Sequence, residues 1–456
     1  MLLGGMIVPA QAQFLRTSYF MEGSHYRMQL NPALTPGRGY INLPVIGTLN
    51  ATVNSSSLGY QDILDIIDNS SEGDYFMSQD FINRLNATNN LNVNLSTDII
   101  SAGWYKGKNF WSFNIGLRND IGATIPRNVF EFMNKMNGAN VNFANLNEEF
   151  GGQGFEINSF AEVGLGFARD INDKLTVGGK VKALLGIGNM KLNVNSVKVN
   201  SQLNGVDLST GYVDPEHASG SASVLVDATL ESSSKLLELQ QSTDSHGEQY
   251  IDNIDFGSFG FAGYGAAIDL GVSYKLLKNL TLSASVLDLG FIKWGKGNTQ
   301  VAYARGNQSY DASTPGEAME FVDMVQSGEV LNFDMLQLGV DENAAKARTT
   351  KLTSTVAVGA EYALLKNWLV LGALYTGRFA QPKTINELSV SANIRPANNF
   401  NVAVSYSLLQ GAGKTFGAAV KLGPIFVGTD YMFFGKNTKN VNAYIGFSIP
   451  LNKQKS

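Results

Sequence analysis

Bulky apolar residues and small polar residues alternate along much of this chain. Phe400, Val402 and Val404 share one parity, and Asn401 and Ser405 lie on the other. A period of two predicts a β-strand with one apolar face. The same pattern recurs in fourteen segments, at about 45–54, 91–106, 110–125, 155–169, 175–190, 261–275, 279–290, 349–363, 367–379, 384–395, 399–409, 413–422, 424–434 and 440–450.

The lengths of these segments and their connections predict a membrane barrel. Strands that cross a bilayer need about 9–11 residues, whereas soluble strands cluster near five or six. Short connections alternate with long ones, and every long connection is odd-numbered: 55–90, 126–154, 191–260 and 291–348. This asymmetry is typical of outer-membrane barrels. We therefore expect an all-β protein, a transmembrane antiparallel β-barrel of about 14 strands, in the cell outer membrane of a Gram-negative bacterium, with both termini in the periplasm.

Charged residues indicate which face of the wall is turned inward. They share the parity of the glycines, and each basic residue exposed to lipid would cost about 2–4 kcal/mol. A soluble barrel would reverse the faces, but about eight strands is the most that side chains can fill; a two-sheet sandwich does not explain the strand lengths. The predicted lumen charges are Arg118, Glu162, Lys180, Lys182, Asp269, Lys275, Glu361, Arg378 and Asp430.

The ends of the chain differ from the predicted barrel at 45–450. Residues 1–12, MLLGGMIVPAQA, end in a small-x-small pattern and are interpreted as a signal peptide remnant or as a plain apolar terminus. Residues 13–44 lack alternation and contain prolines, which fix the backbone, and glycines, which allow tight bends. We expect this segment to form an N-terminal plug, or else a periplasmic tail that leads into the barrel; 451–456 is expected to be a periplasmic tail. The candidate plug residues are Asn31, Pro32, Ala33, Pro36 and Gly37.

Several outer loops have helical apolar spacing, which predicts short helices there. Two interpretations remain open. The helices form a hydrophobic funnel that captures a hydrophobic ligand, or they pack together and close the outer end of the barrel. The candidate capture residues are Val129, Phe130, Phe132, Met133 and Met136. Asn119 interrupts the apolar parity and Gly122 follows, which indicates either a lateral opening or a plain β-bulge. Strand-like stretches within 191–260 predict that the wall extends above the membrane.

Composition narrows the classes of function. The net charge of -5 argues against a nucleic-acid partner, because phosphate binding needs a basic surface. The chain has no cysteine and three histidines, none of them within a recognisable catalytic constellation. We expect no enzyme activity, no cofactor and no metal site; the acidic pair Asp252 and Asp255 is interpreted as a solvated loop rather than as a divalent-ion site.

Two stretches carry a family resemblance. The N-terminal "NPALTPGRGYINLP" and "SVLDLGFIKWGKG" at Ser285–Gly297 resemble a Bacteroidota family of outer-membrane barrels without assigned function. The plug, the helical outer loops and fourteen strands together resemble FadL-type barrels and, more loosely, the PorV and PorP barrels of type IX secretion. FadL-type barrels imply passive uptake of hydrophobic small molecules through a plugged lumen. PorV-like barrels imply a non-transporting accessory or scaffold role in an outer-membrane complex. The expected partners are outer-membrane lipid and either a hydrophobic small-molecule ligand or a complex partner.

Overall fold

The structure is a computed structural model of the chain. It describes residues 16–456 except for 22–23, 43–47, 60–61, 63, 66–67, 69–77, 137–140, 208–211, 215, 244–246, 248, 305–306, 315, 332–333, 380–383, 398–399, 410–414, 432–438 and 455–456. The predicted signal peptide remnant at 1–12 lies outside the described residues. No described helix is long and apolar enough to cross a bilayer.

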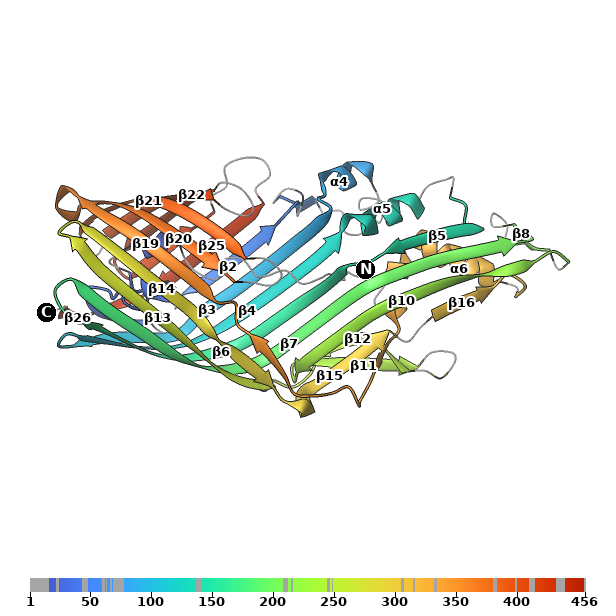
Figure 1. Ribbon diagram of the computed structural model, residues 1–456, viewed down its shortest axis with the longest axis horizontal. Helices are drawn as coiled ribbons and strands as arrows, with labels where there is room; N and C mark the ends of the chain where they lie inside the picture. The colour runs from blue at the N-terminus through green and yellow to red at the C-terminus, as the bar shows by residue number, and fades with distance from the viewer. Residues whose placement is uncertain are drawn as a thin grey trace.

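Antiparallel strands close into a barrel with fourteen wall positions, which confirms the predicted fold class. Strands that follow one another along the chain pair around the wall, and the last position returns to the first through β25–β2 and β26–β1 (Figure 1). The wall strands are β1 (Arg38–Asn42), β2 (Leu49–Ser55), β3 (Thr88–Lys106), β4 (Asn109–Pro126), β6 (Gln153–Asp170), β7 (Leu175–Asn204), β13 (Gly263–Leu277), β14 (Leu280–Trp294), β19 (Thr355–Leu364), β20 (Leu369–Arg378), β21 (Ile385–Ala397), β22 (Phe400–Leu409), β23 (Phe416–Leu422), β24 (Ile425–Thr429), β25 (Asn440–Phe447) and β26 (Ile449–Gln454).

The two faces of each wall strand differ in exposure. On β22, Val404 is 50% exposed and Leu408 is 46% exposed, whereas Asn401 and Ser405 on the opposite face are 2% and 8% exposed. A soluble barrel would place its apolar face inward and its polar face outward. This barrel has the reverse arrangement, as the position of the charges predicts.

Beyond one side of the barrel rim, the sheet that forms the wall extends outward. The inner half of β7 pairs with β13, and its outer half pairs with β10 (Ser219–Ser234). We call this extension of the sheet, with its helices, the outer module; Figure 1 shows it at the end of the molecule opposite the short strands β19 to β25. Its other elements are α5 (Arg127–Met136), β5 (Asn145–Phe150), β15 (Thr299–Ala304), β16 (Asn307–Asp311), α6 (Glu317–Ser327) and β17 (Leu338–Val340).

Shorter elements complete the outer part of the molecule. β18 (Arg348–Lys351) pairs with the outer end of β14, ahead of β19 on the same wall position. The hairpin of β11 (Leu237–Thr243) and β12 (Gln249–Phe256) forms a separate two-stranded sheet. The remaining outer elements are α4 (Gln79–Arg84), β8 (Val206–Asp207), β9 (Tyr212–Val213), η2 (Lys296–Asn298), η3 (Glu329–Leu331) and η4 (Asp334–Leu336). At the inner end, η5 (Leu365–Asn367) forms the turn between β19 and β20.

Two terminal boundaries differ from those expected. Residues 38–42 fall within the expected plug segment but form β1, which pairs with both β3 and β26. Residues 451–454 of the expected periplasmic tail belong to β26, whose Gln454 pairs with Arg38. Both segments gain backbone partners by completing the wall at its inner end, and isolated alternation patterns could not reveal this because each segment is short.

Candidate functional site

The N-terminal segment lies inside the barrel and is bonded to the wall. Its two helical turns are α1 (Arg16–Tyr19) and η1 (His25–Gln29). The Asp430 carboxylate accepts hydrogen bonds from the backbone N–H groups of Arg16, at 3.0 Å, and Thr17, at 2.8 Å. This carboxylate therefore satisfies two donors at the first turn of α1, which have no partner within a helix. Thr17 Oγ1 also lies 2.8 Å from Ser405 Oγ on the lumen face of β22.

Two buried ion pairs connect the same segment to the barrel. Arg16 pairs with Glu387 of β21, and Arg27 pairs with Glu361 of β19. Ser407 Oγ donates to the Glu387 carboxylate at 2.7 Å, so this acid is bonded on both sides. Breaking a buried pair by removing one partner typically costs 3–5 kcal/mol. These contacts hold the segment at defined positions on the wall.

Glycines on the lumen face provide the space in which the segment lies. A methyl group added at Gly178 would lie 2.5 Å from the Pro32 carbonyl oxygen, and one at Gly271 would lie 2.1 Å from Asn31 Oδ1. Tyr19, Phe20, Thr17 and Tyr26 come equally close to the glycines of four other strands. Wall glycines in contact with the segment are Gly178 (β7), Gly271 (β13), Gly359 (β19), Gly372 (β20), Gly417 (β23) and Gly446 (β25).

The predicted plug residues lie in this contact zone, with one exception. Asn31 Nδ2 donates to the backbone carbonyls of Val272 and Ala284, both at 3.1 Å, and Asn31 Oδ1 accepts from the Ala33 N–H at 2.9 Å. Pro32 rests on Gly178, and the Pro36 carbonyl accepts a hydrogen bond from the Tyr105 hydroxyl. Gly37 is exposed and has open space around its Cα.

Below the outer rim, charged side chains form a network across the lumen. Glu162 of β6 is its central acid: Arg118 Nη2 lies 2.9 Å and Lys180 Nζ 2.7 Å from its carboxylate oxygens, and Lys182 Nζ lies 3.9 Å away. Lys182 is buried and also contacts Asp269 at 2.7 Å and Asp288 at 2.6 Å. Mutual neutralisation lets these charges remain in a poorly hydrated interior.

Asp288 belongs to this network although its sequence position does not predict it. Its φ is 55°, and the pairing of β13 with β14 shifts register between Ile268 and Leu270. This bulge places Leu287 and Asp288, two consecutive residues, both in the buried interior. The Asp288 N–H donates to Asp269 Oδ1 at 2.8 Å, which holds the bulge. Strict alternation from Ser283 and Ser285 would turn Asp288 to the outer face, and the bulge turns it inward.

The remaining predicted lumen charges do not form one group. Glu361 and Asp430 bind the N-terminal segment, and the Arg378 guanidinium is buried near the outer end of β20 without a hydrogen bond to any described residue. Lys275 is exposed, because it lies two residues from the inner end of β13. The sequence pattern also missed Asp98, which accepts from Gln29 Nε2 at 3.1 Å at a register shift in β3.

Small polar cavities remain between the segment and the wall. A cavity of about 50 Å³ is bordered by His25, Gln29, Asp98, Arg118 and Lys180, and a second of about 30 Å³ shares Gln29, Asp98 and Arg118 with it. A water molecule needs roughly 10–15 Å³ on this measure. The two cavities therefore have space for a few water molecules, and charged side chains border both of them.

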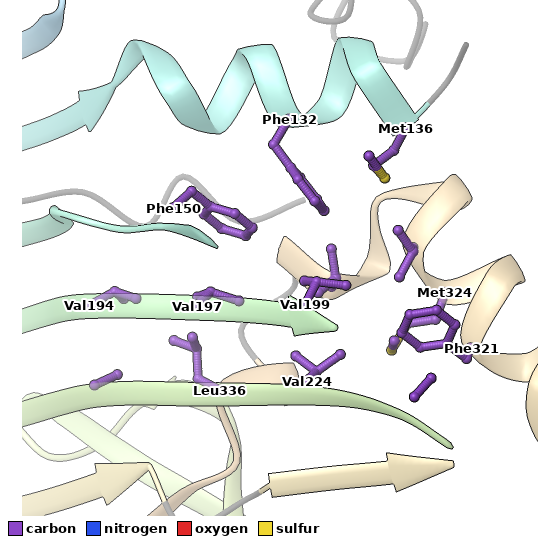
Figure 2. Close-up of a cluster of buried hydrophobic side chains, with 14 of the residues drawn as sticks. Phe132, Met136, Phe150, Val194, Val197, Val199, Val224, Phe321, Met324 and Leu336 are labelled. Atoms are coloured by element: carbon purple, nitrogen blue, oxygen red, sulfur yellow. The ribbon is translucent and has the colours of Figure 1, made fainter. Parts of the chain in front are cut away.

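The outer module has an apolar core of its own. Figure 2 shows Phe132 and Met136 of α5 pointing toward Phe150, Val199 and residues of α6. Val129 belongs to the same cluster, whereas Phe130 and Met133 pack beside Phe81 and Leu85. The five predicted capture residues thus divide between two packed clusters. Burial raises the pKa of Tyr310 in this module to about 12, so the hydroxyl stays protonated and donates to Gln308 Oε1 at 3.1 Å.

The wall is continuous at the predicted lateral opening. Asn119 pairs with Leu95 of β3 and Ser159 of β6, and Gly122 pairs with Asn92 and Glu156 of the same strands. Ser159 Oγ donates to Asn119 Oδ1 at 2.6 Å, so this polar residue has a partner on the neighbouring strand. An exit at this place would require separation of paired strands.

Comparisons with known proteins identify a family and similar barrels. A family model described as "Family of unknown function (DUF5723)" matches residues 32–430. No curated protein matches the chain. The toluene transporter TbuX of Ralstonia pickettii is similar at 10% identity, with a TM-score of 0.43 and 94% of each chain covered. A FadL homologue of Pseudomonas aeruginosa has 10% identity, a TM-score of 0.36 and 98% of each chain covered.

Proposed function

Because the chain belongs to this family of unknown function, DUF5723, we propose a function from the geometry of the barrel itself: an integral outer-membrane β-barrel closed by its own N-terminal segment. The observation that carries the membrane assignment is the outward apolar face, exemplified by Val404 and Leu408, with polar residues of the same strand turned inward. Apolar surface of this extent is stabilised by hydrocarbon and not by water.

The filled lumen supports an accessory or scaffold role over an open pore. Residues 16–21 and 24–34 lie in the interior, the Glu162 network crosses it, and the cavities beside them have space for only a few water molecules. On this proposal the barrel anchors the outer module, whose packed sheet and helices are presented to a partner in an outer-membrane complex.

Uptake of hydrophobic small molecules is a second candidate, favoured by the apolar cluster around Phe132 and Met136 at the outer end. It would require the N-terminal segment to move and α5 to separate from the sheet. The toluene transporter and the FadL homologue named above suggest the ligand class to test.

Two measurements distinguish the candidates. The full chain in planar lipid bilayers should conduct no ions. When purified protein is denatured and extracted, mass spectrometry should find no apolar ligand at a level near one molecule per chain. Steady conductance would contradict the closed barrel. A stoichiometric apolar ligand that is lost in Phe132→Asp, but retained in a control such as His217→Asn in an exposed loop, would favour uptake over the accessory role.

A further inference from the structure

The outward face near the outer ends of β13, β14 and β18 carries lysines among aromatic residues. Lys293 of β14 lies opposite Tyr264 of β13 and opposite Thr349 of β18. Phe291, two residues earlier, lies opposite Lys351. Directly paired residues share a face of the sheet, and Tyr264 and Phe291 are exposed. Lys293 and Lys351 therefore lie on the same outward face.

These lysines form a local positive cluster on a protein whose net charge is -5. Lys293 and Lys351 are diagonal neighbours on adjacent strands, a spacing of roughly 7–8 Å. Exposed Lys296 follows β14 directly, and the side chain of exposed Lys235 lies 2.9 Å from a methyl group built at Gly260, just before β13. None of the four makes an ion pair with an acid among the residues that the structure describes. The cluster is therefore available to an anionic partner.

The acidic residues near the outer ends of β13, β14 and β18 either bind other residues or lie on the hairpin of β11 and β12. Glu231 accepts from Arg348 Nη1 at 2.9 Å. Glu238 and Asp255 lie opposite each other on β11 and β12, beyond the outer ends of β13 and β14 (Figure 1). The charge next to Tyr264 and Phe291 on the wall is therefore positive.

Further exposed aromatic side chains lie shortly before β13 in the chain. Phe256 is 85% exposed and Phe259 is 72% exposed, and both precede β13 by a few residues. The ring of Phe259 contacts that of Phe261 edge to face, with 5.9 Å between centroids. Aromatic rings are enriched where hydrocarbon meets lipid headgroups. Tyr264 and Phe291, which pair with the outward lysines, therefore indicate a lipid headgroup rather than bulk solvent.

The height of the cluster along the wall agrees with this position. Thirteen residue steps separate Leu277, at the inner end of β13, from Tyr264. At about 3.3 Å per residue and a tilt near 40°, this is roughly 33 Å along the barrel axis. The apolar band of an outer-membrane barrel is about 25 Å tall. The row of Tyr264 and Lys293 thus lies just beyond the hydrocarbon on the outer side.

We propose that Lys293 and Lys351, flanked by Tyr264 and Phe291, bind the phosphate groups of an anionic lipid in the outer leaflet. The proposal rests on the membrane location proposed above. Each ammonium group donates charge-assisted hydrogen bonds to phosphate oxygens, and the aromatic rings contact the upper part of the acyl chains. This site would hold the outer module in a fixed orientation on the membrane surface.

Native mass spectrometry of the detergent-purified full chain with added diphosphoryl lipid A tests the proposal. Lys293→Gln/Lys351→Gln should bind this lipid about 30-fold more weakly, the scale expected for two lysines at an anionic surface. Lys106→Gln/Lys108→Gln removes the same charge from exposed residues at an inner turn and should bind as the wild type does. Lys293→Arg/Lys351→Arg keeps both charges and should retain binding.

Several results would overturn the site. Equal binding of a dephosphorylated lipid A would show that the phosphates are not recognised, and equal losses in the two glutamine pairs would show non-specific charge attraction. Displacement by inorganic phosphate at the lipid's concentration would indicate a free-anion site. Vesicle insertion measured on the same sample separates the two proposals: inserted protein without phosphate selectivity refutes this site alone, whereas protein that stays soluble without detergent refutes the membrane assignment.

Discussion

A single methyl group at Gly178 should displace the N-terminal segment from the wall. In Gly178→Ala, the new Cβ would lie 2.5 Å from the Pro32 carbonyl oxygen and 2.7 Å from the Ala33 nitrogen. Both contacts involve backbone atoms, which cannot rotate away as a side chain can. Ordinary contact begins near 3.4 Å, so residues 32–33 must shift by about 1 Å.

Gly179 provides a matched control on the same strand. A methyl group there would meet the Asp269 carbonyl oxygen at 3.5 Å and Leu270 Cδ2 at 3.6 Å, which are ordinary contacts. Overpacking of a well-packed site costs roughly 1–3 kcal/mol. If this cost falls on the closed state of the segment, the equilibrium constant for local opening at residues 31–34 rises about 5- to 150-fold.

Hydrogen–deuterium exchange measures this opening directly. The Leu34 N–H donates to the Asn31 carbonyl at 3.0 Å and should lose protection in Gly178→Ala. Gly179→Ala should exchange as the wild type does. Unchanged exchange in Gly178→Ala would refute the seating of the segment on the wall glycines, and equal acceleration in both variants would attribute the effect to alanine in the strand instead.

Three further changes test other parts of the structure. Lys182→Met leaves Asp269 and Asp288 without their shared cation and should lower the free energy of unfolding by about 3–5 kcal/mol. Urea unfolding in detergent measures this loss. A loss no larger than in the exposed control Lys275→Met would contradict the network. Arg348→Lys cannot reproduce the guanidinium bonds to Ser233, Glu231 and Asn189, so limited proteolysis should cut the outer module faster while the barrel stays intact; an unchanged cleavage rate would show that this contact is dispensable. Val404→Arg should destabilise the lipid-inserted barrel by roughly 2–4 kcal/mol, whereas Val404→Leu should have little effect, as measured by unfolding from vesicles; equal stability of the two variants would place Val404 outside the hydrocarbon.

Much of the barrel follows from the sequence because its physical cause is local. Period-two alternation fixes which side chains share a face, so Val404 and Ser405 could be assigned to opposite faces without a structure. The charges then decide which face is inward. Which charges pair with one another cannot be predicted in the same way. Glu162 and Lys180 are 18 residues apart and on adjacent strands, but Arg118 and Asp288 are separated by 170 residues.

The missed features have identifiable physical reasons. Asp288 changes face at a bulge, which leaves no reliable mark in a pattern of period two. Arg16 and Arg27 belong to a segment without alternation, so their pairing with Glu387 and Glu361 depends on how that segment enters the barrel. Lys275 has the parity of the lumen charges, yet its position near the strand end exposes it. Whether α5 packs or captures a ligand likewise depends on the outer module, which assembles from segments distant in sequence.

The outward orientation of the apolar face is tested most directly by nitroxide scanning of β22. The chain has no cysteine, so single cysteines at each residue from 400 to 408 can be labelled without background. In vesicles, labels at Phe400, Val402, Val404, Tyr406 and Leu408 should be accessible to oxygen dissolved in the hydrocarbon, and the intervening labels should not. Oxygen accessibility of the opposite parity, or no alternation at all, would contradict the assignment of this face to lipid.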